Sequence, residues 1–269
     1  MPSGRGSLDQ GYNVEMSNQT WRTPEAFPAL AADAVHVWRI ALVISDAELA
    51  RRAEVLTVDE LARAARFHFE RDRHRWIATR GAVRWLLAGY AGVAPTSVRF
   101  SLGPHGKPAL EEPDGTGLEF NVSHSGELAL CAVSHGRAVG VDVEAVRPEF
   151  ANLSVARRFF APAEATVLAA LPQSEQTAAF FDCWSRKEAY IKARGTGIAL
   201  GLDRFEVSLT PGRPAALLAT HDEPGATERW RLVALVPDNG YAGALVTDGP
   251  ARLECWQWSE TAREMHLHL

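Results

Sequence analysis

Two acidic residues, Asp142 and Glu144, stand two positions apart in the segment VGVDVE. In a β-strand such residues project from one face, while Val141 and Val143 face the opposite side. Paired carboxylates backed by apolar residues are costly to bury without a cation, and their hard oxygen atoms favour magnesium, which commonly bridges substrate phosphates. A solvated edge strand would show the same pattern, and the pair taken alone favours that ordinary interpretation.

A carboxylate and an amine also share one face of a predicted helix. In FFDCWSRKEAYIKARGTG, Glu188 and Lys192 are four residues apart, in line with Ser185 and Phe181 one and two turns earlier. Glu placed before Lys at this spacing is also the favourable arrangement for a surface ion pair. The helix alone therefore leaves both interpretations open.

Two turns carry groups that suit an anion. His124 follows Ser123 in FNVSHSGE, where hydroxyls and backbone N–H groups can gather around a negative charge. Lys107 stands between Gly106 and Pro108, which restrict its backbone. Each segment is equally compatible with a plain polar turn.

Seven arginines and four acidic residues fall between Asp59 and Tyr90, the most basic stretch of an acidic chain. Arginines on a solvated helix face are common, and some of these must pair with Glu70 and Asp72. A compact polyphosphate needs only about two or three bidentate arginines. Nucleic-acid binding would require more positive charge, interleaved with stacking aromatic residues.

The composition indicates a soluble globular protein of one large domain or two small ones. The 269 residues are 46% hydrophobic, with a net charge of −5 and a pI near 6.0, which gives no overall attraction to nucleic acid or membrane. Three scattered cysteines without zinc-ligand spacing predict reduced thiols in a cytoplasmic protein. No apolar run reaches the roughly 18 residues of a membrane span, and residues 1–30 are predicted to be a flexible leader.

Local patterns predict an α+β fold. The expected elements are a strand at 35–44, helices within 57–90, short strands within 97–144, short helices within 150–172 and a long helix at 175–194 stopped by Gly195. The segment AVGVDVE is expected to form a hairpin with the preceding ELALCAV.

The chain also resembles itself. VAPTSVRFSLGPHGKPAL recurs as IALGLDRFEVSLTPGRPAAL, and two further stretches pair in the same order. Coincidence among common hairpin patterns is one explanation. The other is two similar α+β halves, 31–147 and 148–269, which face each other across a ligand-binding cleft.

The order of FNVSHS, GVDVE, WSRKEAYIK and GTG resembles the Sfp-type 4′-phosphopantetheinyl transferases, and the match covers roughly residues 57–202. The resemblance implies a pseudo-twofold monomer of two α/β halves with coenzyme A in the cleft between them. It also implies an enzyme that transfers the 4′-phosphopantetheine group of coenzyme A to a serine of an apo acyl or peptidyl carrier protein, giving holo-carrier and 3′,5′-ADP.

Carried over residue by residue, the motifs imply a complete set of site residues. The magnesium ligands are Asp142, Glu144 and Glu188, and the catalytic residues are Glu188, Lys192 and Asp142. The residues that bind coenzyme A are Arg63 at the 3′-phosphate, Arg75, Lys107 beside the adenine and ribose, Ser123, His124 and Lys192. A position that is basic in some members is Glu60 here, a departure that bears on the strength of 3′-phosphate binding.

In the implied mechanism, Glu188 or a metal-bound water accepts the proton of the carrier serine, and Lys192 stabilises the departing 3′,5′-ADP. The carrier pathway stays open among fatty acid, polyketide and nonribosomal peptide synthesis. A non-catalytic coenzyme A-binding or carrier-docking protein of the same fold is the alternative, and the intact acidic set argues against it. Neither a nucleic-acid nor a membrane partner is expected.

Overall fold

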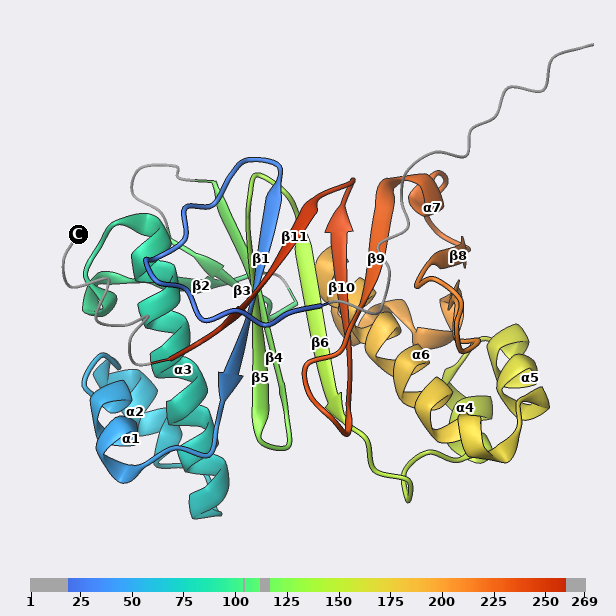
Figure 1. Ribbon diagram of the computed structural model, residues 1–269, viewed down its shortest axis with the longest axis horizontal. Coiled ribbons are helices and arrows are strands. Elements are labelled where there is room, and N and C mark those ends of the chain that lie inside the picture. Colours follow the sequence, from blue (N-terminus) through green and yellow to red (C-terminus); the bar gives the residue numbers. More distant parts are fainter. Residues whose placement is uncertain (1–18, 104, 112–116, 260–269) are drawn as a thin grey trace, which may run out of the picture.

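Residues 34–135 form the first set of elements (Figure 1). The structure, a computed structural model, describes residues 19–103, 105–111 and 117–259. The elements of this first set are β1 (Ala34–Ala41), α1 (Asp46–Ala53), α2 (Val58–Ala64), α3 (Glu70–Ala91), η1 (Pro95–Ser97), β2 (Phe100–Leu102), β3 (Pro108–Leu110), β4 (Leu118–Ser125) and β5 (Leu128–His135).

Residues 139–257 form the second set, and most of it repeats the order of the first. Its elements are β6 (Val139–Ala145), α4 (Leu153–Phe159), α5 (Pro162–Ala170), α6 (Gln173–Arg194), η2 (Gly197–Leu200), η3 (Leu202–Arg204), β7 (Phe205–Val207), β8 (Leu217–Thr220), α7 (Ala226–Arg229), β9 (Trp230–Leu235), β10 (Tyr241–Asp248) and β11 (Arg252–Gln257). Both sets run from a strand through two short helices to a 22-residue helix, a short hairpin and two longer strands.

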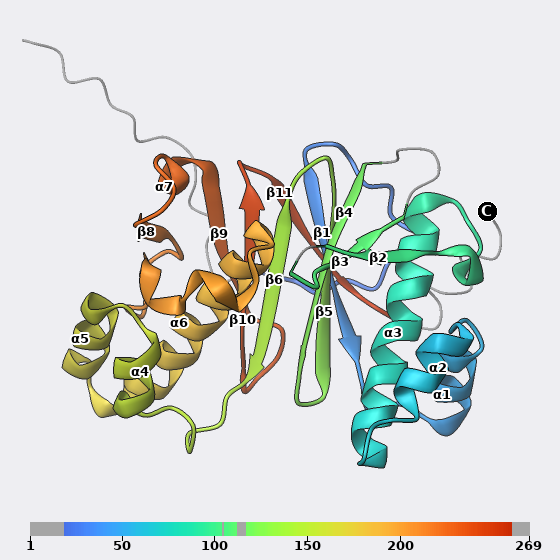
Figure 2. The ribbon, with the colours of Figure 1, turned by 180° about the vertical axis from the view of Figure 1, so that it is seen from behind.

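Two sheets lie in the middle of the molecule, with α3 on one side and α6 on the other (Figures 1 and 2). The first sheet has the strand order β11-β1-β5-β4 and the second the order β6-β10-β9. The apolar core between the sheets contains Val37 and Val141, and separate cores fill the spaces under α3 and under α6. This arrangement of helices and mainly antiparallel strands confirms the predicted α+β class.

The predicted hairpin between β5 and β6 is wrong, because the chain changes sheets at the turn between them. Both edges of β5 are already paired, with β1 and with β4, whereas β6 pairs with β10. Side chains of β4 connect it to β6 instead. Asn121 Oδ1 accepts the N–H of Val141 at 2.8 Å, and Ser125 Oγ accepts the N–H of Ala145 at 3.1 Å. These bonds bring β4 and β6 together at the seam of the two sheets.

The helix ends follow from local sequence. At the start of α2, the Thr57 hydroxyl accepts the N–H of Glu60, and the Glu60 carboxylate accepts the N–H of Thr57. Helices α3 and α6 both end at a glycine with φ of 65°, Gly92 and Gly195, a left-handed conformation that costs glycine little. The predicted stop of the long helix at Gly195 is confirmed.

Part of the predicted leader packs on the body of the protein. The Phe27 ring contacts Trp38 and Tyr90, and the Arg22 guanidinium lies 4.4 Å from the centre of the Trp256 ring. Residues 1–18 of that leader lie outside the described residues. The two sheets are not divided at the predicted boundary of 147 and 148. Strand β6, which precedes this boundary, pairs with β10, which follows it, and β11 pairs with β1 in the other sheet.

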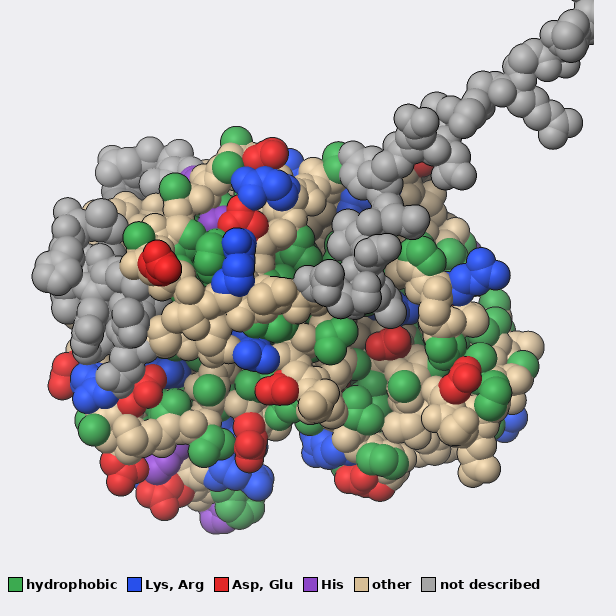
Figure 3. Space-filling view, in the orientation of Figure 1, with side chains coloured by type: hydrophobic (Ala, Val, Ile, Leu, Met, Phe, Trp, Pro, Cys, Tyr) green, Lys and Arg blue, Asp and Glu red, His purple; other side chains and the backbone are tan. Residues whose placement is uncertain are grey.

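The described residues contain no helix that is both long and apolar enough to cross a lipid bilayer. On the face that Figure 3 shows, basic and acidic side chains are interspersed, without a broad patch of one sign.

Candidate functional site

The predicted catalytic side chains meet where β4, β6 and α6 come together. Asp142 of β6 is 2% exposed, and its Oδ1 atom accepts hydrogen bonds from Ser123 Oγ at 2.7 Å and from Lys192 Nζ at 2.6 Å. Lys192 Nζ also donates to Ser123 Oγ at 2.8 Å. Residues from three separate elements thus form one closed polar cluster.

The second oxygen of Asp142 is the unsatisfied group of this cluster. Oδ2 is buried and has no hydrogen-bond partner within the described part of the chain. Burial raises the pKa of Asp142, although the nearby Lys192 ammonium and the Ser123 hydroxyl oppose the shift. A buried carboxylate oxygen without a partner is costly and suits a cation or a donor brought by a ligand.

Glu144 and Glu188 lie close enough to Asp142 for its charge to affect their pKa values. Burial raises the pKa of Glu144, and the charges of Asp142 and Glu188 add to the shift, while a hydrogen bond from Ser125 Oγ at 2.8 Å opposes it. Burial and the charge of Asp142 also raise the pKa of Glu188. A bound cation would relieve this mutual repulsion.

The three carboxylates are neighbours, yet their side chains are not arranged as a metal centre. Among the described residues, no group of three His, Cys, Asp or Glu side chains has a geometry that could hold a metal ion. Lys192 instead compensates the charge of Asp142. The donor set itself, hard carboxylate oxygens with one unsatisfied atom at Asp142, has the chemistry that magnesium prefers.

Ser123 and His124 are adjacent in β4, so their side chains point to opposite faces of the strand. Ser123 faces Asp142 and Lys192, whereas His124 lines a cavity of about 400 Å³. Although His124 is exposed, the protein around it and the charges of Lys192 and Arg75 lower its pKa. His124 is therefore neutral near pH 7 and can donate one hydrogen bond.

The cavity beside His124 lies between α2, α3 and the β2-β3 hairpin. Its lining includes Arg63 and Arg80, with the aromatic rings of Trp76 and Phe100. The Arg63 guanidinium lies 5.8 Å from the centre of the Trp76 ring. We refer to this space as the arginine cavity. Basic and aromatic groups together suit a nucleotide.

Two predicted coenzyme A residues are placed differently. Arg75 does not line the arginine cavity. Its charge lowers the pKa of His124, which does line the cavity. Lys107 Nζ donates to the carbonyl of Val139 at 3.1 Å, and burial lowers its pKa. Lys107 thereby joins the loop before β3 to the start of β6, close to Gly195 at the end of α6.

Comparison with known proteins identifies the family. A sequence model described as the 4′-phosphopantetheinyl transferase superfamily matches residues 138–246, and one described as 4′-phosphopantetheinyl transferase, N-terminal, matches residues 44–136. The 4′-phosphopantetheinyl transferase HetI of Nostoc sp. is 42% identical over 87% of this chain and 96% of its own length. The chain belongs to the 4′-phosphopantetheinyl transferase superfamily.

Two further members of the superfamily show the same relationship. The 4′-phosphopantetheinyl transferase Sfp of Bacillus subtilis is 34% identical over 62% of this chain and 72% of its own length. The 4′-phosphopantetheinyl transferase ffp of Bacillus subtilis is 31% identical over 77% of this chain and 88% of its own length. The resemblance recognised from the motifs is thus confirmed, while the roles of individual residues stay predictions.

Several residues that support the site in this superfamily member could not be recognised from its sequence motifs. Ser125 holds Glu144, and Lys187, next to Glu188 on α6, is fully buried with its ammonium 2.7 Å from Glu164. The WSRKEA motif contains Lys187, but sequence alone gives no signal that this side chain turns inward. Arg80 is one of seven arginines in its stretch, and nothing local distinguishes it.

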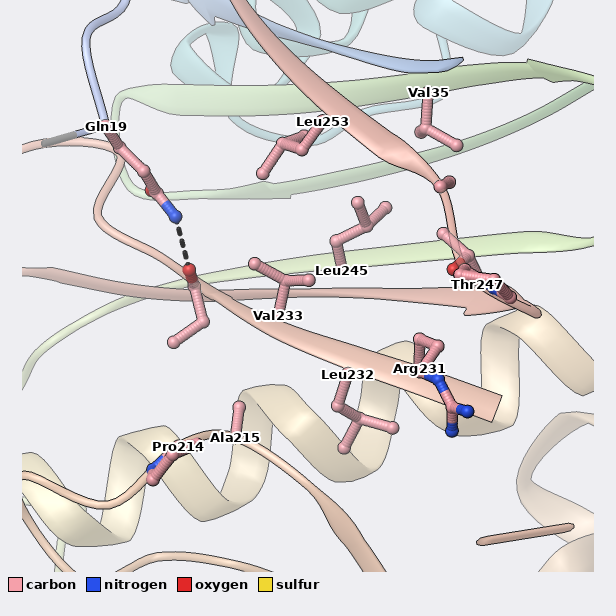
Figure 4. Close-up of a pocket in the computed structure, with 13 residues that line it drawn as sticks. Gln19, Val35, Pro214, Ala215, Arg231, Leu232, Val233, Leu245, Thr247 and Leu253 are labelled. Atoms are coloured by element: carbon pink, nitrogen blue, oxygen red, sulfur yellow. Dashed lines mark hydrogen bonds between the residues drawn. The ribbon is translucent and has the colours of Figure 1, made fainter. Parts of the chain in front are cut away.

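A second cavity, of about 360 Å³, opens elsewhere on this superfamily member (Figure 4). Val233, Leu245 and Leu253 line it, and the Gln19 side chain donates to the carbonyl of Ala234 at 2.6 Å. The predicted site residues are not among the described residues that line this cavity.

Proposed function

We propose that this chain transfers the 4′-phosphopantetheine group of coenzyme A to a serine of an apo acyl or peptidyl carrier protein. The observation that carries the proposal is the cluster in which Asp142, Ser123 and Lys192 bond to one another beside Glu144 and Glu188. Membership of the superfamily supports the reaction, and the cluster supports these residues as its centre.

Magnesium is the cofactor that suits this centre. Asp142, through its unsatisfied Oδ2 atom, and the Glu144 and Glu188 carboxylates would hold it. When bound, the ion supplies charge neutralisation at the pyrophosphate of coenzyme A.

The side chains of the cluster perform the remaining tasks. Glu188 is placed to accept the proton of the carrier serine: burial favours its protonated form, whereas a cation bound beside it would lower its pKa. The serine oxygen forms a bond to the phosphorus next to the pantetheine, and the bond from that phosphorus to the bridging oxygen breaks. Lys192 offers an ammonium to the oxygen that leaves with 3′,5′-ADP.

The arrangement of the chain supports a working monomer. The repeated order of elements supports two pseudo-twofold halves, with coenzyme A in a cleft at the seam of the sheets where β4 meets β6 and α6. One chain then provides both sides of the site. The three cysteines are free and buried, which supports a reducing compartment such as the cytoplasm.

The test is transfer onto an apo carrier, read by intact mass spectrometry of the carrier. We expect one phosphopantetheine group to be added in the presence of coenzyme A and magnesium, and the addition to stop when EDTA removes the metal. Glu188→Gln should slow transfer at least about 100-fold. The matched control is Glu175→Gln, an exposed residue in the first turn of the same helix, which should transfer at the normal rate.

The alternative of a non-catalytic protein makes a different prediction for the same experiment. Calorimetry would then show that coenzyme A binds while no carrier gains mass under any condition. An equal loss of rate in Glu188→Gln and Glu175→Gln would remove Glu188 from the proposed centre while leaving the transferase activity in place.

A further inference from the structure

Glu60, the residue at which this chain departs from the basic pattern, holds two arginines in place. Its Oε1 atom accepts from Arg80 Nε at 2.6 Å, and its Oε2 atom accepts from Arg84 Nε at 2.7 Å. Burial acts to raise the pKa of Glu60, but the Arg84 and Arg80 hydrogen bonds and charges hold it below its usual value. Glu60 is therefore ionised, and each of its oxygens is paired with an arginine, while Oε2 also accepts the N–H of Thr57, so it adds no free negative charge to the arginine cavity.

The two arginines held by Glu60 differ in what they can still bind. Arg84 is 2% exposed, and its Nη1 atom donates hydrogen bonds to the carbonyls of Pro95 and Val98. Arg80 lines the arginine cavity, and its side chain is 22% exposed. Within the described part of the chain, the Nη1 and Nη2 atoms of Arg80 have no hydrogen-bond acceptor, so four N–H donors stay available.

Arg80 is also fixed in orientation. Its guanidinium lies 3.6 Å from the centre of the Phe100 ring, and Glu60 holds it at Nε. A planar guanidinium that is held by a ring and by one carboxylate presents its remaining donors as a rigid fork, which suits bidentate binding of a phosphate. Because such a side chain is already held in place, it loses little conformational entropy when a ligand binds.

Positive charge exceeds negative charge around Arg80. The guanidinium groups of Arg63, Arg80 and Arg84 are set against the carboxylates of Asp59 and Glu60, and Asp59 also lines the cavity. Burial lowers the pKa of Arg80, and the neighbouring charges of Arg84 and Arg63 lower it further, against the effect of Glu60. A bound anion would relieve this repulsion between like charges.

We propose that Arg80, together with Arg63, binds the 3′-phosphate monoester of coenzyme A, and that the Glu60–Arg80 pair restores from α3 the positive charge that position 60 lacks. The inference rests on the proposed function, which supplies the ligand. Coenzyme A carries this monoester dianion away from its reacting pyrophosphate. The arginine cavity likewise extends from His124, next to the catalytic cluster, to the arginines of α2 and α3.

The test compares coenzyme A with 3′-dephospho-coenzyme A as donors to one apo carrier. In the unmodified protein, we expect a lower KM for coenzyme A than for the dephospho form. Arg80→Gln should raise the KM for coenzyme A by about 10- to 100-fold, the loss of a charge-assisted pair, and leave kcat and the KM for 3′-dephospho-coenzyme A unchanged. Arg80→Lys, which keeps the charge without the fork, should fall between the two.

The matched control is Arg73→Gln on the same helix, where the arginine pairs with the exposed Glu70 outside the arginine cavity. It should leave both KM values unchanged. If Arg80→Gln raises the KM for both donors equally, Arg80 acts on the fold and not on the phosphate, and the inference is wrong. The same conclusion follows if neither KM changes.

A binding measurement separates this inference from the proposed function. By calorimetry, 3′,5′-ADP should bind the unmodified protein more tightly than 5′-ADP, which lacks the 3′-phosphate, and Arg80→Gln should remove that difference. This result would support the inference even if no carrier were modified. Equal binding of the two nucleotides to the unmodified protein would overturn it even if transfer were robust.

Discussion

At the scale of single residues, burial decides what each lysine does. The chain contains only three lysines, Lys107, Lys187 and Lys192. Lys192 has a side chain that is 26% exposed and reaches the catalytic cluster, whereas Lys187 is 0% exposed. The ammonium of Lys187 donates to Glu164 at 2.7 Å and to the carbonyls of Leu202 and Phe205 at 2.7 and 2.6 Å. All three of its protons therefore have acceptors.

We predict that Lys187→Met lowers the free energy of unfolding by about 3–5 kcal/mol, because Glu164 and two carbonyls lose a buried partner. Urea denaturation followed by circular dichroism measures the change. The control is Arg157→Met, which removes an exposed cation from α4 and should change stability by less than about 0.5 kcal/mol. Similar stabilities of Lys187→Met and the unmodified protein would show that this network contributes little.

Sequence reasoning found the residues whose roles depend on local spacing and missed those whose roles depend on distant neighbours. Asp142, Glu188 and Lys192 stand in short motifs, and the structure brings them together. Lys187 bonds to Glu164 in α5, to Leu202 in η3 and to Phe205 at the start of β7, and all three partners lie outside its own helix. Arg80 and Arg84 differ from the other arginines of their stretch through their contacts with Glu60 and Phe100, and Arg80 alone of the two lines the arginine cavity.

At the scale of elements, the close approach of α6 to β6 places the helix side of the site against the strand side. Gly140 of β6 makes this approach possible. A Cβ atom built on Gly140 would overlap the carbonyl oxygen of Ala189 and the backbone nitrogen of Ala193, and would lie 2.8 Å from the Cα atom of Ala193. These backbone atoms belong to the stretch of α6 that carries Glu188 and Lys192.

We predict that Gly140→Ala forces α6 away from β6, which costs about 1–3 kcal/mol of stability and reduces kcat for transfer. The reason is that Lys192 and Glu188 would move relative to Asp142. Urea denaturation and the carrier-loading rate measure the two effects. Gly92→Ala is the control, since its positive φ strains the backbone in open space at the end of α3. It should lose about 1 kcal/mol and keep its kcat. A kcat loss in both variants would attribute the effect to lowered stability.

Element ends were predictable and strand partners were not. The capping box of α2 and the glycine stops of α3 and α6 involve residues within a few positions of each other. The pairing of β6 with β10, and of β11 with β1, joins segments about a hundred or more residues apart, and no local pattern specifies it. The wrong hairpin prediction came from treating neighbours along the chain as neighbours in a sheet.

At the scale of the whole molecule, β11 closes the fold by carrying the end of the described chain back to the first sheet. It pairs parallel to β1 and sets Glu254 opposite His36. His36 is fully buried, and its Nδ1 atom lies 2.7 Å from the Tyr90 hydroxyl. Its Nε2 atom lies 3.6 Å from the Glu254 carboxylate. The junction of the first and last strands thus contains a titratable group that the chemistry does not use.

Burial lowers the pKa of His36 from 6.5 to about 4, and the charges of Arg252, Arg22 and His135 act in the same direction against that of Glu254. The unfolded chain therefore binds a proton at this residue below pH 6.5, while the folded chain does not until about pH 4. Unfolding takes up a proton in this window, so the contribution of His36 is complete above pH 6.5 and is lost as the pH falls towards 4, by about 3 kcal/mol in total.

We predict that the stability lost between pH 7 and pH 5 is about 2 kcal/mol larger in the unmodified protein than in His36→Asn, which keeps a polar group near Tyr90 but cannot titrate. Urea denaturation of both proteins at the two pH values gives this difference. The comparison isolates His36, because the buried carboxylates Asp142, Glu164 and Glu188 have raised pKa values and shift stability in the opposite direction in both proteins. Parallel pH dependence of the two proteins would show that His36 is protonated with little cost in the folded state, and that the junction of β1 and β11 does not set the acid limit of the fold.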